Sequence, residues 1–145
     1  MRTVAMLGGV LMMAGLATPA AAQAKESDAL VRKLKAPLSA SWGRGMRPTG
    51  ESLTGTLRAE ASARFPLALS AGRTYAVVGL CDDACHDLDL RLFGPDGTEV
   101  SSDVEPNERP VVLVVPRRAG TYQVRAYMAE CRSEVCTFGI QLFVR

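Results

Sequence analysis

The sequence predicts an all-β fold, an antiparallel β-sandwich of about eight strands with a short N-terminal helix. After residue 50, short runs of alternating apolar and polar residues are separated by turn residues, a pattern typical of sandwiches. The 145 residues are 48% hydrophobic and 22% charged, as expected for one globular domain. The net charge of +2 excludes a nucleic-acid binder that depends on a concentrated basic face.

Residues 1–24 have the layout of a secretory signal peptide. Arg2 precedes the apolar stretch 4–17, and a run of small residues follows, as in signal peptides with a cleavage site. The apolar stretch is short for a permanent membrane anchor. We therefore expect cleavage after Ala22 or Ala24, with the second favoured, and a periplasmic or secreted protein without a later transmembrane segment.

Residues 25–50 are predicted to form an arm that precedes the sandwich domain at 51–145. Ser27 is a suitable N-cap for a short helix, whose apolar stripe would contain Leu30, Val31, Leu34 and Leu38. A stripe of this kind either docks on its own domain or binds a membrane surface or partner. Residues 39–50 include Trp42 among glycines, arginines and a proline, which indicates an irregular connector.

The strands are identified in order by their alternation. Pro66 indicates that the strand at 65–69 is an edge strand. The turns at 71–73 and 94–97 contain Gly72 and Gly97, and glycine accepts a positive φ. The apolar run 111–115 is predicted to be a central strand. The other strands are expected at 53–57, 74–80, 88–92, after the turn at 94–97, at 122–128 and at 138–144.

The four cysteines are expected to form disulfides at one end of the sandwich. Cys81 and Cys85 bracket one predicted turn, and Cys131 and Cys136 bracket another. Four cysteines allow three pairings. The local pairs Cys81 with Cys85 and Cys131 with Cys136 are favoured because each loop is short. A zinc site that also includes His86 is the alternative.

From Gly55 onward, the sequence resembles the bacterial pre-peptidase C-terminal domain family. The resemblance rests on the segments GTL, RFPLALSAGRTYAVVGL, DLDLRLFGPDG, RPVVLVVP, AGTYQVRAYM and FGIQLFV. It implies a jelly-roll-like sandwich that usually follows the catalytic domain of secreted peptidases and in some cases binds substrate or calcium. The CDDAC and CRSEVC loops go beyond the family pattern, so we expect a free-standing, disulfide-containing variant.

An acidic cluster near the cysteines is the candidate metal site. Oxygen ligands at this density suit Ca²⁺, which takes six to eight of them. The candidate ligands are Asp82, Asp87, Asp89 and Glu105. The alternatives are that these carboxylates solvate a loop, or pair with arginines such as Arg91. No other cofactor is expected.

Three aromatic residues are candidates for a ligand platform. They are Trp42, Tyr127 and Phe143, of which the last two lie out of phase with the apolar residues of their strands. Aromatic side chains beside arginine are favoured at binding surfaces. The alternative is that Tyr127 and Phe143 pack beneath the N-terminal arm.

The sequence contains no complete catalytic constellation. His86 is the single histidine, and no GxSxG motif accompanies the serines, as an α/β-hydrolase serine site would require. We therefore expect a non-enzymatic exported module that binds a protein or polysaccharide partner. The alternatives are a small secreted hydrolase that uses acidic residues at the cysteine-bearing end, and a structural envelope protein stabilised by calcium.

Overall fold

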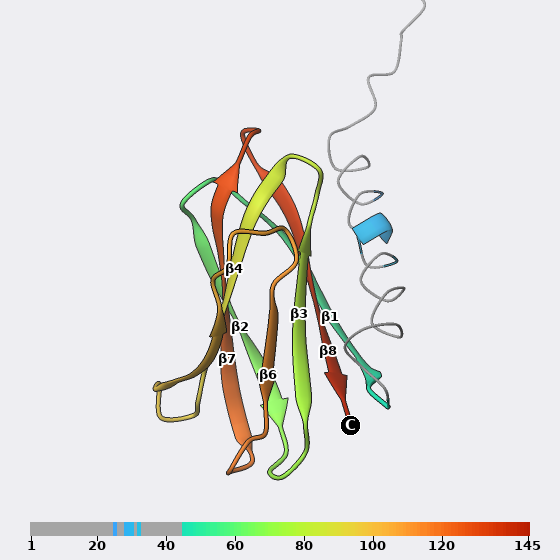
Figure 1. Cartoon of the computed structure of the whole chain (residues 1–145), viewed down its shortest axis with the longest axis vertical. Coiled ribbons are helices and arrows are strands. Elements are labelled where there is room, and N and C mark those ends of the chain that lie inside the picture. Colours follow the sequence, from blue (N-terminus) through green and yellow to red (C-terminus); the bar gives the residue numbers. More distant parts are fainter. Residues whose placement is uncertain (1–24, 26–27, 31, 33–44) are drawn as a thin grey trace, which may run out of the picture.

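The computed structural model describes residues 25, 28–30, 32 and 45–145 of the chain. The described part is a sandwich of eight strands (Figure 1). The strands are β1 (Arg47–Leu57), β2 (Ser62–Leu69), β3 (Tyr75–Cys81), β4 (Cys85–Phe93), β5 (Glu99–Asp103), β6 (Val111–Val114), β7 (Gly120–Cys131) and β8 (Cys136–Val144). The predicted all-β class is confirmed.

The strands form two antiparallel sheets of four strands each. Sheet A has the order β1-β8-β3-β6, and sheet B has the order β2-β7-β4-β5. The pairs β4 with β5, β3 with β6, β2 with β7 and β1 with β8 are nested in the sequence, like a long hairpin rolled into two layers. This is the strand order of a jelly roll.

The core lies between the two sheets, as the alternation predicts. On β4, Leu88, Leu90 and Leu92 are fully buried, while Asp89 and Arg91 between them are half-buried. The opposite sheet contributes residues such as Val77 and Ile140 to the same cluster. Each of these strands therefore presents one apolar face to the interior.

Strand β6 lies at the edge of sheet A, so the prediction of a central strand at 111–115 is wrong. Among the described strands, it pairs with β3 alone. Val112 points into the core and is 1% exposed, whereas Leu113 is 46% exposed. The run is apolar throughout because the side chains that point away from the core, such as Leu113, form part of an exposed apolar surface. By contrast, β2 is an edge strand, as Pro66 predicts.

Strand β1 begins at Arg47, within the predicted connector. Arg47 pairs with Val144 and Pro48 with Phe143, and a register shift separates Pro48 from Ser52. The sandwich therefore begins a few residues before the predicted boundary at 51. A segment rich in glycine and proline can still extend a strand at the edge of a sheet, where irregular pairing is tolerated.

The two glycine turns form as predicted. Gly97 donates its N–H to the carbonyl of Gly94 at 2.9 Å, and its φ is 80°. Asp96 accepts the N–H of Thr98 at 3.0 Å through its side chain. Gly72 has a φ of 74° in the turn between β2 and β3. Both glycines adopt the left-handed conformation that other residues rarely take.

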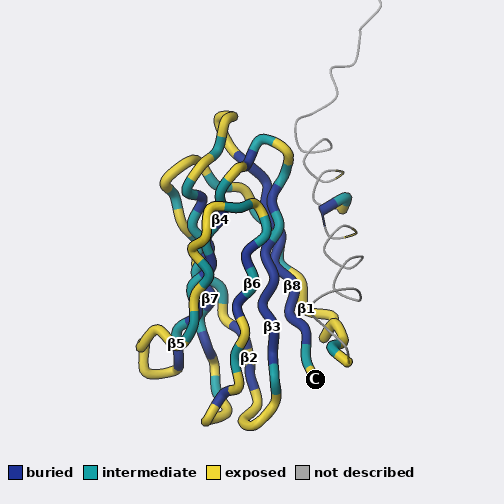
Figure 2. The backbone as a smooth tube through the Cα atoms, in the orientation of Figure 1, coloured by how far each residue is buried: buried dark blue, intermediate teal, exposed yellow. Residues whose placement is uncertain are grey.

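The described residues before Gly45 are helical. Leu30 is buried, whereas Lys25, Asp28 and Arg32 are exposed (Figure 2). The predicted signal peptide at 1–24 and the other members of the apolar stripe, Val31, Leu34 and Leu38, lie outside the described residues. In the parts of the chain that the structure describes, no helix is long and apolar enough to span a membrane.

Candidate functional site

Two local disulfides close one end of the sandwich. Cys81 bonds to Cys85 with Cα atoms 5.8 Å apart, and Cys131 bonds to Cys136 with Cα atoms 5.9 Å apart. Cys85 and Cys131 are partners in the β4–β7 register, so the two bridges are neighbours. The predicted pairing is confirmed. The zinc alternative is wrong, because disulfide sulfurs cannot supply the thiolates that it requires.

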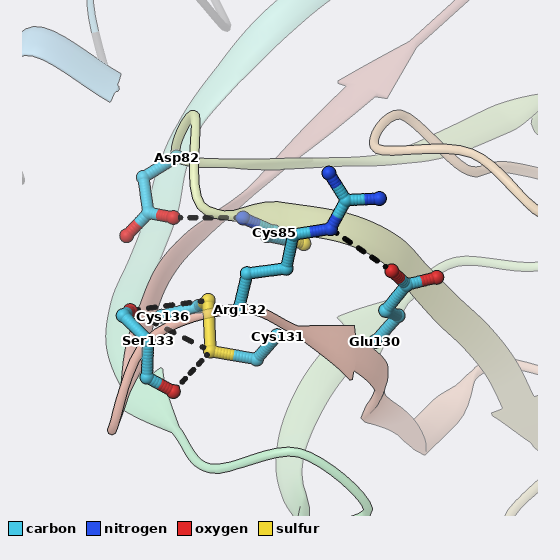
Figure 3. Close-up of polar contacts among 7 residues, drawn as sticks. All are labelled: Asp82, Cys85, Glu130, Cys131, Arg132, Ser133 and Cys136. Carbon is cyan, nitrogen blue, oxygen red and sulfur yellow. Dashed lines mark hydrogen bonds and ion pairs between the residues drawn. A yellow bond between two sulfur atoms is a disulfide. The ribbon is translucent and has the colours of Figure 1, made fainter.

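Asp82 organises the disulfide-bridged loops. Its Oδ1 accepts the N–H groups of Ala84 and Cys85 at 3.2 Å each, and its Oδ2 accepts the N–H of Thr137 at 2.5 Å. Figure 3 shows the contact with Cys85 beside the second disulfide. Both carboxylate oxygens of this predicted calcium ligand therefore bind backbone N–H groups that link the β3–β4 turn to β8.

The other predicted calcium ligands are spread over β4 and the next connection. Asp87 and Asp89 lie on the outer side of β4, and Glu105 is exposed in the β5–β6 connection. Among the described residues, no three His, Cys, Asp or Glu side chains gather to hold a metal ion. The calcium site therefore stays a prediction.

The carboxylates on β4 are electrostatically unfavourable where they lie. Burial raises the pKa of Asp87, which the N–H of Asn107 counteracts and the charge of Glu130 reinforces. Burial also raises the pKa of Asp89, with Asp87 adding to the shift and Arg91 opposing it. Partial burial and like charges both disfavour an ionised carboxylate.

His86 is exposed and lines a hollow of about 400 Å³ at the disulfide-bridged end. Asp82, Asp83 and Glu108 line the same hollow. The candidate hydrolase residues Asp87 and Asp89 are not among its lining residues. The structure therefore does not combine the histidine and these two carboxylates in one pocket.

The two described residues of the predicted aromatic platform, Tyr127 and Phe143, do not lie together. Phe143 is 2% exposed and packs with Ala76 and Val78 on the outer side of sheet A, so it is wrong as a ligand-contacting residue. Tyr127 is half-buried on β7 of sheet B, with the guanidinium of Arg125 5.6 Å from its ring centre. The two rings belong to different sheets, and Trp42 lies outside the described residues.

Exposed apolar side chains gather where the edges of the two sheets approach each other. Val100 on β5, Leu113 on β6 and Val115 just after β6 are 47%, 46% and 57% exposed. They line a groove of about 480 Å³. We call these three residues, with Arg117 and Arg118 at the same groove, the β5–β6 edge surface.

The backbone of β6 is open along this surface. Gly79 donates its N–H to the carbonyl of Pro110 at 2.9 Å. Backbone polar groups alternate in direction along an antiparallel strand. The N–H and C=O groups of Val112 therefore point toward β3, whereas those of Val111 and Leu113 point outward. The N–H of Val111 donates to Asp103 Oδ2 at 2.7 Å. The polar groups of Leu113 are directed toward the open edge.

The charge along the groove is predominantly positive. Arg117 and Arg118 are exposed beside Val115. The acidic group in the lining is Asp96, and hydrogen bonds from Thr98 lower its pKa. A lowered pKa keeps Asp96 ionised, so two guanidinium groups and one carboxylate leave this end of the groove with an excess of one positive charge.

The sequence reasoning missed this surface because it treated 111–115 as fully buried. One signal was present: Pro110 and Pro116 flank the run. Proline cannot donate a ladder hydrogen bond, and it is therefore found at edges and ends of sheets. Two prolines around a short apolar run favour an edge strand over a central one.

Comparison with known proteins identifies a relationship at the level of the fold. No family model matches the chain, and no curated protein matches it. A solved structure, the periplasmic inhibitor of g-type lysozyme PliG from Aeromonas hydrophila, is 12% identical with a TM-score of 0.50, over 72% of this chain and 91% of that chain. At this identity the likeness concerns architecture alone. The chain shares its β-sandwich fold with this periplasmic inhibitor.

Proposed function

We propose that this chain is an exported, non-enzymatic module that binds a protein partner through the β5–β6 edge surface. The proposal rests on one observation: the exposed residues Val100, Leu113 and Val115 surround one groove beside an open strand. Clustered exposed apolar side chains mark interaction sites. A free strand edge offers main-chain hydrogen bonds to an added strand.

The matching partner is an extended protein segment with apolar side chains and a carboxylate near one end. The apolar side chains would fill the groove beside Leu113, and the carboxylate would lie near Arg117 and Arg118. Arginine pairs well with carboxylates because its planar guanidinium can donate two hydrogen bonds. The segment would pair with the outward N–H and C=O groups of Leu113.

Export is supported by two features of the chain. Both disulfides are of a kind that persists in oxidising compartments, and residues 1–24 resemble a signal peptide. The structurally similar PliG is itself a periplasmic inhibitor of an enzyme. It therefore provides a precedent for this fold in a protein that acts on another protein.

A protein partner is favoured over a polysaccharide. Sugar recognition by the predicted aromatic platform would require exposed rings, but Phe143 is buried and Tyr127 lies on the other sheet. The hydrolase alternative is less favoured because Asp87 and Asp89 lie apart from the hollow that contains His86. The resemblance to the pre-peptidase C-terminal domain family remains part of the proposal, supported by the jelly-roll strand order.

The test compares the wild-type mature protein with two variants in a binding assay. Leu113→Asp places a charge in the groove, and Val135→Asp alters an exposed apolar residue outside it. Biotinylated proteins are incubated with envelope extract from the native host, and captured proteins are quantified by mass spectrometry. Purified g-type lysozyme is a second probe, and purified peptidoglycan is a third.

The expected result is one protein captured by wild type and by Val135→Asp, with an affinity for Leu113→Asp at least about tenfold lower, equivalent to 1.4 kcal/mol. Equal capture by Leu113→Asp and wild type would contradict the assigned surface. Peptidoglycan binding that all three proteins retain, without a captured protein, would replace the proposal with the polysaccharide alternative.

A further inference from the structure

We propose that residues 25–44 of this chain dock on the outer face of sheet A and act as a strap across it. We define this face by the outward side chains of β3 and β8, namely Ala76, Val78, Gln141 and Phe143. This face adjoins the β5–β6 edge surface, because Leu113 is the register partner of Ala76. The residues assigned to the two surfaces nevertheless differ, and neither proposal depends on the other.

The first argument is the burial of both sides of β3. Val77 belongs to the core between the sheets, so its neighbours Ala76 and Val78 point to the opposite side. In a strand, successive side chains alternate between the two faces. Ala76, Val77 and Val78 are nevertheless all 0% exposed. Something other than sheet B must therefore cover the outer side of β3.

Strand β8 shows the same double burial. Ile140 and Leu142 belong to the core, and the alternate residues Gln141 and Phe143 are 0% and 2% exposed. Phe143 is the register partner of Ala76, and Gln141 is the partner of Val78. The four side chains thus form one continuous covered patch across two neighbouring strands.

On sheet B, the described outward side chains are not covered to the same extent. The outward residues of its central strands, Asp89 and Arg91 on β4 and Arg125 and Tyr127 on β7, are half-buried and mostly charged. An antiparallel sheet with one solvated face has this alternation of apolar and polar residues. The outer face of sheet A has instead the composition of a buried surface.

The position of the chain before β1 identifies the occupant. Met46, the residue before β1, packs against the cluster of Ala76, Val78 and Phe143. The chain therefore begins β1 beside this face. From β1 to β8, the chain consists of the eight strands and their connections, so the segment before Gly45 is the part available to cover it.

The described helical residues have the pattern expected of a docked strap. Leu30 is 3% exposed, whereas Asp28 and Arg32 are exposed. Figures 1 and 2 show residues 28–30 on the side of the molecule where sheet A lies. A helix with one buried side chain between exposed charged ones is amphipathic, and its apolar side matches the apolar outer face.

Gln141 is the one polar side chain among the four that define this face. Its Nε2 donates to the carbonyls of Glu51 at 2.8 Å and Leu142 at 3.0 Å, while its buried Oε1 has no hydrogen-bond partner among the described residues. Both donor bonds stay within sheet A. The amide nitrogen is therefore anchored within the sandwich. The other three side chains of the face are apolar, and they favour a covering segment through hydrophobic contact.

The experiment uses photo-crosslinking of the mature chain. A benzophenone amino acid replaces Leu30 in one protein and Arg32 in a matched control, and crosslinked peptides are mapped by mass spectrometry. The Leu30 probe is expected to crosslink within the monomer to the peptides that contain Ala76–Val78 or Gln141–Phe143. The Arg32 probe is expected to give at least about fivefold less of these products.

A second measurement is independent of the probe. Leu30→Asp is expected to speed amide hydrogen exchange in residues 25–44 and to increase binding of the apolar dye ANS, while Arg32→Asp leaves both unchanged. Crosslinks between two chains would show that a second copy covers the face, and would overturn the proposal. Exchange in wild-type residues 25–44 as fast as in an unfolded peptide would also overturn it.

Discussion

The Asp82 side chain connects two segments of the described part of the chain. One carboxylate accepts three backbone N–H groups from two connections that are far apart in the sequence. Its own N–H donates to the carbonyl of Thr137 at 2.9 Å. Hydrogen bonds to a charged acceptor are stronger than neutral ones. Asp82 thus aligns the first disulfide loop with the start of β8.

We expect Asp82→Ala to lower the free energy of unfolding by about 1–3 kcal/mol, because it leaves partly buried N–H groups without their acceptor. Urea denaturation followed by circular dichroism measures the change. Glu105→Ala, which alters an exposed carboxylate in another connection, should change stability by less than about 0.5 kcal/mol. Equal effects of the two substitutions would assign no special role to Asp82.

Asp89 should make stability depend on pH with a defined sign. Its pKa in the folded protein is raised, first by burial and then by Asp87. The unfolded chain therefore ionises at lower pH, and stability is lost as pH rises through the folded-state pKa. Asp89→Asn should raise the free energy of unfolding by at most about 0.5 kcal/mol at pH 7. It should leave this free energy unchanged below about pH 3. Thermal melts at both pH values test this, and a larger gain at the acidic pH would contradict it.

At the scale of elements, β3 is packed on both sides, and little space is left around Gly79 for a side chain. A Cβ atom added there would lie 3.0 Å from Pro110 Cγ, 3.2 Å from Leu88 Cδ2 and 3.3 Å from Leu90 Cδ1. Gly79→Ala should therefore cost about 1–3 kcal/mol through overpacking. Denaturant unfolding measures this cost. A stabilised variant would show that the neighbouring side chains give way easily.

The two disulfides should contribute to stability without being required for the sheets. Replacing Cys131 and Cys136 together by serine removes a short loop constraint, for which the chain-entropy account gives about 2 kcal/mol. The β-sheet signal in circular dichroism should remain, because β7 and β8 are held by pairing with other strands. Loss of the β-sheet signal at low temperature would show that this bridge is needed for folding.

The strands could be predicted where one face is apolar and the other is polar. Leu88, Leu90 and Leu92 revealed β4 in this way, and Pro66 revealed that β2 is an edge strand. The environment of β6 could not be predicted from its composition. An apolar run has the same sequence whether its outer side is covered by another element or forms an exposed surface, and the strand order decides between these.

At the scale of the whole molecule, the nested pairing delays the completion of sheet A. Its first strand pairs with the last, with Leu53 opposite Ile140, and such contacts between distant parts of the chain slow folding. Refolding of the disulfide-intact protein should therefore take milliseconds to seconds. Stopped-flow circular dichroism after dilution from urea measures the rate. Folding completed in microseconds would conflict with this topology.

The candidate site was only partly predictable from the sequence, because the strand order decides which residues meet. The positions of Cys81 and Cys131 at the ends of consecutive strands revealed one end of the sandwich and its local disulfides. The β5–β6 edge surface joins residues of two different sheets, and alternation along one strand contains no information about the neighbouring sheet. Phe143 failed as a binding residue because its outward face is covered.

The pairing of β1 with β8 places both ends of the sandwich at one corner. Arg47 and Val144 are register partners, while the disulfides lie at the other end of β8. Joining the two ends by a short linker and opening the chain at the Gly97 turn would therefore give a circular permutant with every strand pair retained. A protein fused to the C-terminal end would likewise emerge far from the cross-linked loops.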